Sequence, residues 1–395
     1  MTKISTIGTY LPPWGSERAR TAGLDEDAVT LAVAAGCAAL RATDPASVHR
    51  VVVVGRNLPL LEGGNAAAVL AGLGVSAHTA VTEVVGGAPA VLDALTDAAP
   101  GTLVIGTDSV GAAGAAAAFC GDGGPSLTLV DRITRSMPVT TRDAFGGSSD
   151  YADPRLLRVR GLGESLERLD RSAPIVAVAG LLGRDATALC DGTPPPLPTI
   201  GASAAVLALA ALVDSGHTGL VAAVEQAAVV LATLGSGAVT VVRDERPARP
   251  ASTNVATPGS DLPIALAAYD RAFDAKLRLE AARCTGCGTL SYPHRYRCLS
   301  CGSEQPTESV ALPRDGEIYT LATIRVPVPG LVSPYTVTLV ELGDVGVRVL
   351  VKLTGAEAGS VRIGDRGRLV FRLVAVRSGV PDYGYGFLPD EEVAA

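Results

Sequence analysis

The chain has 395 residues, of which 48% are hydrophobic, 4% aromatic and 18% charged. This composition excludes a disordered protein, and the 45 glycines follow no collagen-like period. The net charge of −7 at pH 7 argues against broad electrostatic binding to nucleic acid or to an anionic membrane.

The first residues lead directly into a short β-like segment, without the basic start and long apolar run of a secretory signal. Apolar stretches such as residues 204–213 are far shorter than the roughly 18 residues of a membrane span. Four of the seven cysteines cluster between residues 284 and 301, which does not indicate a disulfide framework. We therefore expect a soluble, cytoplasmic protein with no membrane partner.

Residues 1–245 alternate apolar runs with alanine-rich helical segments. Runs at 51–54, 103–105, 127–130 and 239–242 are typical of strands that are buried on both faces. A helix is predicted at 24–40, with Asp25, Glu26 and Asp27 in its first turn, where the helix dipole favours negative charge. The irregular stretch 134–163 is predicted to form long surface loops. The alternation predicts an α/β fold around a layered mixed or parallel sheet.

The remainder of the chain has a different pattern. The polar, proline-bearing segment 246–262 predicts a linker, and residues 263–282 predict a helix. Short strands are predicted at 318–326, 336–342, 347–353 and 368–376, at the spacing of a small β-barrel. We divide the chain into a domain at 1–245, a linker at 246–262, a helix and cysteine cluster at 263–312, and a barrel at 313–395.

The cysteine cluster has the spacing of a metal site. Cys284, Cys287, Cys298 and Cys301 form two C-x₂-C pairs separated by ten residues, and a glycine follows each pair. Two such turns can direct four thiolates at one ion, which is the closed arrangement of structural zinc. We predict zinc at this site, or iron in its place, and no catalytic role, because four thiolates leave no open coordination position.

Several motifs of the C-terminal region occur together in one known family. They are Cys-Thr-Gly-Cys-Gly from Cys284, Tyr292-Pro293, Cys-Leu-Ser-Cys-Gly-Ser from Cys298, Gly316-Glu-Ile-Tyr-Thr and Ile363-Gly364-Asp365. With them, residues 263–392 resemble acyl-CoA-associated proteins that join a rubredoxin-like zinc ribbon to an OB-fold (domain of unknown function thirty-five). The resemblance implies an accessory subunit that docks on a catalytic thiolase or ketoacyl synthase and helps to shape its acyl-CoA tunnel. It also implies an acyl-CoA or carrier-bound thioester as the substrate.

OB-folds can also bind single-stranded nucleic acid, through basic grooves that carry stacking aromatic side chains. The predicted barrel has several arginines, with Tyr319 and Tyr335, but acidic residues are interspersed among them and no arginine-aromatic stripe emerges. We therefore expect no nucleic-acid partner, although a nucleic-acid or purely structural binding module remains an alternative.

The N-terminal region resembles a second family. The segments that carry the likeness are Ile4–Pro13, Asp25–Ala35, Ala66–Gly74, Gly106–Ser109 and Leu234–Ala238. They resemble the thiolase-like superfamily, in particular hydroxymethylglutaryl-CoA synthase and ketoacyl synthase III. The resemblance implies a thiolase-like layered fold and a homo- or heteromeric dimer or tetramer.

The catalytic residues of that superfamily are missing from the expected positions. The enzymes need a cysteine at a helix N-terminus, and a histidine with an asparagine or a second histidine. The nucleophile position falls at about Ala88, and residues 80–95 contain no serine or cysteine. No histidine lies between residues 79 and 216, and the family's Asn-x-Gly turn reads Thr199-Ile200-Gly201.

Three other residues remain as weak catalytic candidates. Cys120 and Cys190 could each be a relocated nucleophile, although a core or tunnel-wall role is the alternative for Cys120. Glu83 is the carboxylate at the expected nucleophile turn, where pairing with a neighbouring group is the alternative. No catalytic residue is therefore assigned.

Besides the binding module, two further functions remain open from the sequence. The first is a non-catalytic condensing-enzyme-like subunit with a fused zinc-ribbon/OB accessory domain. It would be inactive alone and would support a partner thiolase or ketoacyl synthase that makes or breaks a carbon–carbon bond beside a thioester. The alternative is a self-sufficient acyltransferase of the hydroxymethylglutaryl-CoA synthase or ketoacyl synthase III type that uses a relocated cysteine.

Overall fold

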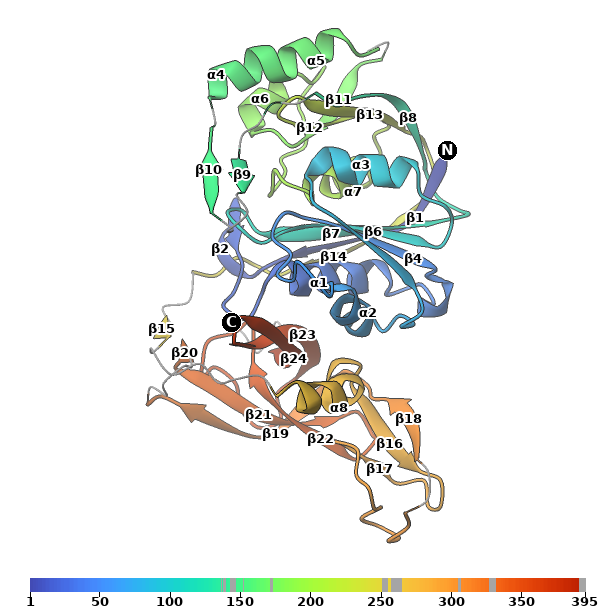
Figure 1. Ribbon diagram of the computed structural model, residues 1–395, viewed down its shortest axis with the longest axis vertical. Coiled ribbons are helices and arrows are strands. Elements are labelled where there is room, and N and C mark those ends of the chain that lie inside the picture. Colours follow the sequence, from blue (N-terminus) through green and yellow to red (C-terminus); the bar gives the residue numbers. More distant parts are fainter. Residues whose placement is uncertain are drawn as a thin grey trace.

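The computed structural model describes residues 1–135, 137, 140–142, 147–151, 153–170, 173–250, 255–256, 265–304, 307–326 and 332–390. Five layers of helix and sheet form the N-terminal part, and the C-terminal part lies beneath them (Figure 1). Among the described residues, no helix is both long and apolar enough to cross a bilayer.

One half of the sheet system contains six strands. They are β1 (Thr2–Leu11), β4 (Arg50–Val54), β5 (Ala80–Val84), β6 (Thr102–Asp108), β7 (Gly114–Gly121) and β14 (Thr240–Glu245). Their order is β14-β1-β7-β6-β4-β5, with parallel pairs at β14-β1, β6-β4 and β4-β5 and antiparallel pairs at β1-β7 and β7-β6. The run of valines in β4 suits this position, because β-branched side chains fit a strand that is covered on both faces.

The other half continues from β1 through β8 and lies above the first in Figure 1. Its strands are β8 (Ser126–Ile133), β11 (Ile175–Ala179), β12 (Gly219–Glu225) and β13 (Ala228–Leu234), in the order β11-β12-β13-β8. Two helices, α3 (Ala88–Thr96) and α7 (Ala204–Asp214), lie between the two halves (Figure 1). Both helices belong to one core cluster that includes residues of β4, β7, β12 and β13.

Short helices cover the upper face. They are α4 (Pro154–Leu156), the π-helix η2 (Leu157–Gly163), α5 (Glu164–Glu167) and α6 (Gly183–Thr187). Leu162, Leu166 and Ala186 from this layer are buried with residues of β11, β12 and β13. Strands β9 (Thr140–Arg142) and β10 (Ser148–Asp150) form a separate two-stranded sheet at the side (Figure 1). The stretch 134–163 therefore holds regular elements in addition to loops, although residues 143–146 lie outside the described part.

The lower layer contains α1 (Ala28–Ala39) and α2 (Ala66–Leu73), with the short 3-10 helix η1 (Pro45–Ser47) between them. Gly8 of β1 allows α1 to approach closely, because an added Cβ would lie 2.1 Å from Ala39 N. Helix α1 begins four residues later than the sequence predicts. Asp27 is its N-cap and accepts a 2.9 Å hydrogen bond from Thr30 N, so Asp25 and Glu26 precede the helix.

The C-terminal part begins with α8 (Leu266–Leu277) and a three-stranded sheet, β17-β16-β18. These strands are β16 (Glu280–Cys284), β17 (Leu290–Ser291) and β18 (Thr307–Ala311). A closed five-stranded barrel follows in the order β19-β21-β22-β24-β23. Its strands are β19 (Asp315–Ile324), β21 (Tyr335–Leu342), β22 (Val347–Leu353), β23 (Arg366–Arg377) and β24 (Val380–Pro389).

Two small two-stranded sheets complete the fold, β2 (Trp14–Ser16) with β3 (Ala19–Thr21) and β15 (Val255–Ala256) with β20 (Val332–Ser333). The pair β15-β20 links the predicted linker to the barrel, but residues 251–254 and 257–264 lie outside the described part. The predicted helix at 263–282 is shorter than expected, because the chain turns into β16 at Glu280.

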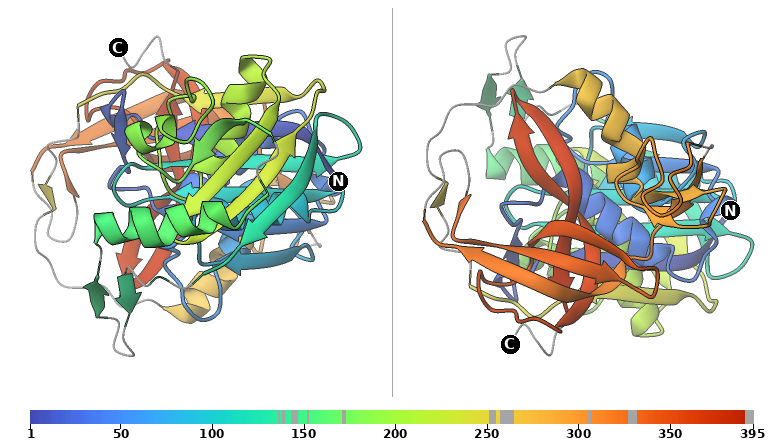
Figure 2. Two further views of the ribbon diagram at one scale, coloured as in Figure 1. Left: turned by 90° about the horizontal axis from the view of Figure 1, so that it is seen from above. Right: turned by 90° about the horizontal axis from the view of Figure 1, so that it is seen from below.

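The barrel packs against the lower helical layer. One core cluster joins residues of α1 and α2, such as Val33 and Leu70, to barrel residues such as Phe371 and Phe387. Seen from below, barrel strands cross α1 (Figure 2), and α8 contacts α2. The apolar surface of α1 and α2 is therefore buried by the same chain that supplies the sheet above it.

Charged and polar groups cross the same contact. Arg372 of β23 is fully buried, donates a 2.9 Å hydrogen bond to Tyr10 Oη and lies 3.2 Å from Glu26 Oε1. Tyr383 of β24 donates a 2.7 Å hydrogen bond to Asp27, the N-cap of α1. Arg314 donates a 2.9 Å hydrogen bond to Gly72 O in the last turn of α2. The contact thus satisfies groups at the N-terminus of α1 and the C-terminus of α2.

Candidate functional site

The two buried helices begin at or near the positions where the resemblance to the thiolase-like superfamily places catalytic residues. Helix α3 begins at Ala88, the expected nucleophile position, and Ala88 is fully buried. Helix α7 begins at Ala204, and Ala202 and Ser203 separate it from the turn Thr199-Ile200-Gly201. A helix N-terminus presents unpaired N–H groups and a partial positive charge, which can lower the pKa of a thiol placed there.

A carboxylate lies at the start of α3. Glu225, the last residue of β12, accepts a 3.0 Å hydrogen bond from Gly87 N, the N-cap of the helix. The other carboxylate oxygen of Glu225 pairs with Arg56, which follows β4. The N-terminal charge of α3 is therefore met by a side chain of the protein itself.

A second carboxylate lies at the start of α7. Asp108, the last residue of β6, accepts hydrogen bonds of 2.8 Å from Ala202 N and 2.9 Å from Ser203 N. Ser203 Oγ donates a third hydrogen bond of 2.6 Å to the same carboxylate. The backbone N–H groups of Ala202 and Ser203 are thus engaged within the chain.

A cavity of about 1110 Å³ lies beside α7 and reaches this turn. Leu207 and Ala211 of α7 line it, together with the proline run 194–196 and Ile200. None of the residues that line it in the described part of the chain is a cysteine, histidine or asparagine. Thr199 stands at the asparagine position of the family's turn, and its Oγ1 is hydrogen-bonded to Ser203 Oγ at 2.7 Å.

The three weak catalytic candidates occupy separate places. Cys120 lies in β7, is fully buried, and burial raises the pKa of its thiol to about 12. Cys190 follows α6 and is half-buried, and burial followed by the nearby Asp191 raises its pKa. Glu83 in β5 accepts 2.7 Å hydrogen bonds from both N and Nδ2 of Asn65.

The four histidines do not join any of these groups. All four are exposed, and His294 lies outside the group of cysteines that could hold a metal.

Sequence reasoning did not identify Asp108 or Glu225. The residues that donate to them are 94, 95 and 138 positions away along the chain, so no local motif marks either carboxylate.

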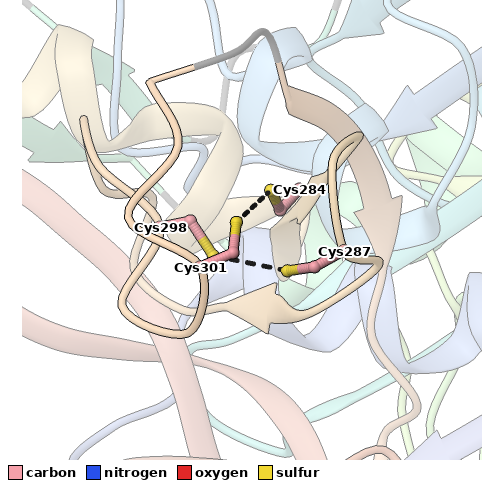
Figure 3. A group of neighbouring side chains, drawn as sticks. All are labelled: Cys284, Cys287, Cys298 and Cys301. Carbon is pink, nitrogen blue, oxygen red and sulfur yellow. Dashed lines mark hydrogen bonds between the residues drawn. The ribbon is translucent and has the colours of Figure 1, made fainter.

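The four ribbon cysteines converge on one point. Their Sγ atoms all lie within 4.8 Å of one another, and Figure 3 shows them pointing toward a common centre. The Sγ atoms of Cys284 and Cys301 are 3.8 Å apart, and those of Cys287 and Cys298 are 3.6 Å apart. Such a set of soft donors fits a tetrahedral zinc ion.

The two turns that hold these cysteines have the same form. Gly288 has a φ of 76° and donates a 2.8 Å hydrogen bond to Cys284 O, and Gly302 has a φ of 71° and donates a 3.0 Å bond to Cys298 O. Glycine adopts this left-handed conformation without steric cost. Hydrogen bonds from the Thr289 side chain and backbone lower the pKa of Cys287 to about 6, whereas the hydrogen bond with Cys287 raises the pKa of Cys301 to about 11.

Family models match this C-terminal part. Residues 274–307 match the rubredoxin-like zinc ribbon domain of ChsH2, and residues 309–372 match its C-terminal OB-fold domain. A DUF35 domain-containing scaffold protein of Methanothermobacter thermautotrophicus is 30% identical over 118 residues, which are 29% of this chain and 88% of the relative. The chain belongs to the DUF35 family. Its zinc ribbon and OB-fold are those that the sequence predicts.

A second DUF35 relative has a more specific name. The benzoylsuccinyl-CoA thiolase subunit BbsA of Thauera aromatica is 34% identical over 110 residues, which are 28% of this chain and 74% of that subunit. The relatives of the DUF35 region therefore include a scaffold protein and a subunit of a thiolase.

The N-terminal part is similar to a solved structure in fold. A variant of OleA from Xanthomonas campestris superposes with a TM-score of 0.51 at 14% identity, over 59% of this chain and 98% of that chain. This likeness confirms the thiolase-like fold that the sequence predicts, and at this identity it shows the fold alone.

Proposed function

We propose that this chain is a non-catalytic, condensing-enzyme-like subunit. Its fused DUF35 region would support a partner thiolase or ketoacyl synthase in forming or breaking a carbon–carbon bond next to an acyl-CoA or carrier thioester. The thiolase-like fold and the DUF35 relationship support the class of chemistry. The name of BbsA, a subunit of a benzoylsuccinyl-CoA thiolase, supports the dependence on a partner.

The observation that carries the proposal is the start of α3. A condensing enzyme would use this N-terminus to stabilise a thiolate, but Ala88 carries a methyl group and Gly87 N donates to Glu225. The carboxylate supplies negative charge at the point where the enzyme's thiolate would develop it. The N-cap N–H group of α3 is therefore already engaged by Glu225, which itself pairs with Arg56.

The alternative of a relocated cysteine has less support. Attack on a thioester needs a thiolate with access to substrate and a group that manages protons. Cys120 is enclosed in β7, and burial raises its pKa to about 12. Cys190 is half-buried, and both causes of its pKa shift oppose the thiolate.

We further propose that Cys284, Cys287, Cys298 and Cys301 bind one zinc ion in a structural role. Bound zinc would hold the two turns together in a small sheet that has little apolar core of its own. The four thiolates would fill its coordination sphere, so these residues would bind no substrate.

Two experiments test the proposal. The purified chain is incubated with acetyl-CoA and weighed intact by mass spectrometry, and we expect no acyl adduct. An adduct that disappears in the Cys120→Ala or Cys190→Ala variant would show a self-sufficient acyltransferase and would overturn the proposal.

The second experiment identifies the partner. Affinity purification from the native host, followed by mass spectrometry, should recover a thiolase-like chain that has its own cysteine and histidine. Carbon–carbon bond chemistry should then need both chains together. Turnover by this chain alone would contradict the proposal.

A further inference from the structure

A second cavity lies between the two regions of the chain. Its volume is about 470 Å³, within the usual range of small-molecule sites. One wall comes from Trp14 and residues 21–25, which follow β1, and the other comes from β20, from strands β21, β22 and β23 of the barrel, and from residues 354–356. The cavity is separate from α3 and α7, and neither region forms it alone.

The walls of this cavity combine polar and apolar groups. Trp14, Leu24, Leu353, Leu373 and Val376 line it. Leu24 is 64% exposed and Val376 is 58% exposed, so the chain leaves apolar surface uncovered at this point. A ligand with an apolar body would remove that surface from water.

One amine enters the same cavity. Lys352 of β22 is half-buried, and its Nζ lies 5.2 Å from the centre of the Tyr335 ring. Lys352 forms no ion pair within the described part of the chain, whereas Lys276 pairs with Asp382. The lysine thus carries a partly desolvated positive charge without a carboxylate of the protein in contact with it.

The other charged groups nearby are already paired. Asp25 lies 3.9 Å from Arg372, and Arg372 also contacts Glu26 and hydrogen-bonds Thr354 Oγ1 at 3.1 Å. Asp25 lines the same cavity, so it would repel a dianionic phosphate about twice as strongly as it repels a single carboxylate. A single carboxylate matches the single amine.

We propose that this cavity binds a small monocarboxylate with an apolar body, its carboxylate on Lys352 and its body against Trp14 and Leu373. The ligand would contact both regions at once and would stabilise their contact by mass action. This site is independent of the proposed partner-dependent chemistry, since it shares no residue with the starts of α3 and α7.

The chain contains a reporter for this site, because Trp14 is its single tryptophan. Octanoate is titrated into the full-length protein while the tryptophan emission is followed, with 1-octanol as the neutral probe of similar size. We expect a saturable change with octanoate at one site per chain, and a weaker affinity for 1-octanol. Isothermal titration calorimetry checks the stoichiometry.

Matched variants test the role of the amine. Lys352→Met keeps the length of the side chain and should weaken octanoate binding roughly tenfold or more, since a charge-assisted hydrogen bond is lost. Lys3→Met changes an exposed lysine away from the cavity and should leave the affinity unchanged. Ala375→Phe narrows the cavity and should weaken octanoate and 1-octanol alike.

Three outcomes would overturn the proposal. The first is the absence of a saturable change with octanoate in the wild-type chain. The second is equal affinity of Lys352→Met and Lys3→Met for octanoate, with circular dichroism showing both to be folded. The third is equal affinity of the wild-type chain for octanoate and 1-octanol.

Discussion

Asp108 and Glu225 occupy corresponding places in the N-terminal fold. Each ends the strand that follows one of the two buried helices, and each carboxylate accepts hydrogen bonds at the start of the other helix. Asp108 ends β6, which follows α3, and accepts from the residues that precede α7. Glu225 ends β12, which follows α7, and accepts from the residue that precedes α3. The exchange ties the halves together at the edge where the catalytic residues of a condensing enzyme are expected.

Removing the Asp108 carboxylate should destabilise the protein. Asp108→Ala leaves Ala202 N, Ser203 N and Ser203 Oγ without their acceptor, and we expect a loss of about 1–3 kcal/mol of unfolding free energy. Urea denaturation measures it. Asp122→Ala, at an exposed aspartate, is the control and should change the stability by less than about 0.5 kcal/mol. Equal losses in the two variants would show that the cap contributes nothing specific.

The sequence predicts the fold of each region and the zinc ribbon, and not the hydrogen bonds that connect distant parts of the chain. The ribbon is encoded within 18 residues, so its spacing is sufficient for the prediction of the zinc ribbon. The caps at Asp108 and Glu225 connect residues that are 94 to 138 positions apart, and only the fold brings them together.

Strand β7 shows a second limit of sequence reasoning. Its run of alanines favours a helix by propensity, yet it forms a central strand. Ala115 and Ala117 face the cluster that contains α1, and Ala116 and Ala118 face the cluster that contains α7. Small side chains fit a strand that has a helix close to each face, and this tertiary requirement overrides the local preference.

Loss of one ribbon cysteine should remove the metal. Cys287→Ser leaves three thiolates, and we expect the bound zinc to fall from about one equivalent per chain to a small fraction of that. Elemental analysis after gel filtration measures the metal, and limited proteolysis should show faster cleavage between β16 and β18. Cys190→Ser is the control, because Cys190 lies beside α6 and should keep the full zinc content. Full zinc content in Cys287→Ser would contradict the assignment.

Breaking the buried ion pair between the two regions should cost more than any surface change. Arg372→Met leaves Glu26 buried without its counter-charge, and we expect a loss of about 3–5 kcal/mol in unfolding free energy. Arg366→Met, on the same strand, removes only a 3.8 Å pair between exposed groups and should cost less than about 1 kcal/mol. Chemical denaturation compares the two variants. Similar losses for both would show that the contact at Glu26 is not a major source of stability.

The same site should make stability depend on pH through Glu26. Burial raises the pKa of Glu26, while Arg372 opposes the shift and Asp25 adds to it. The folded state therefore binds the Glu26 proton more tightly than the unfolded chain does. The contribution of this proton to the free energy of unfolding is fully present below the ordinary pKa of a glutamate. It is lost as the pH rises through the raised value. Urea midpoints of the wild-type protein from about pH 4 to about pH 8 should contain this fall, and Glu26→Gln should remove it, since an amide does not titrate. Glu62→Gln, at an exposed position, should keep the wild-type slope. Parallel curves for the wild-type protein and Glu26→Gln would mean that Glu26 ionises equally in the folded and unfolded states.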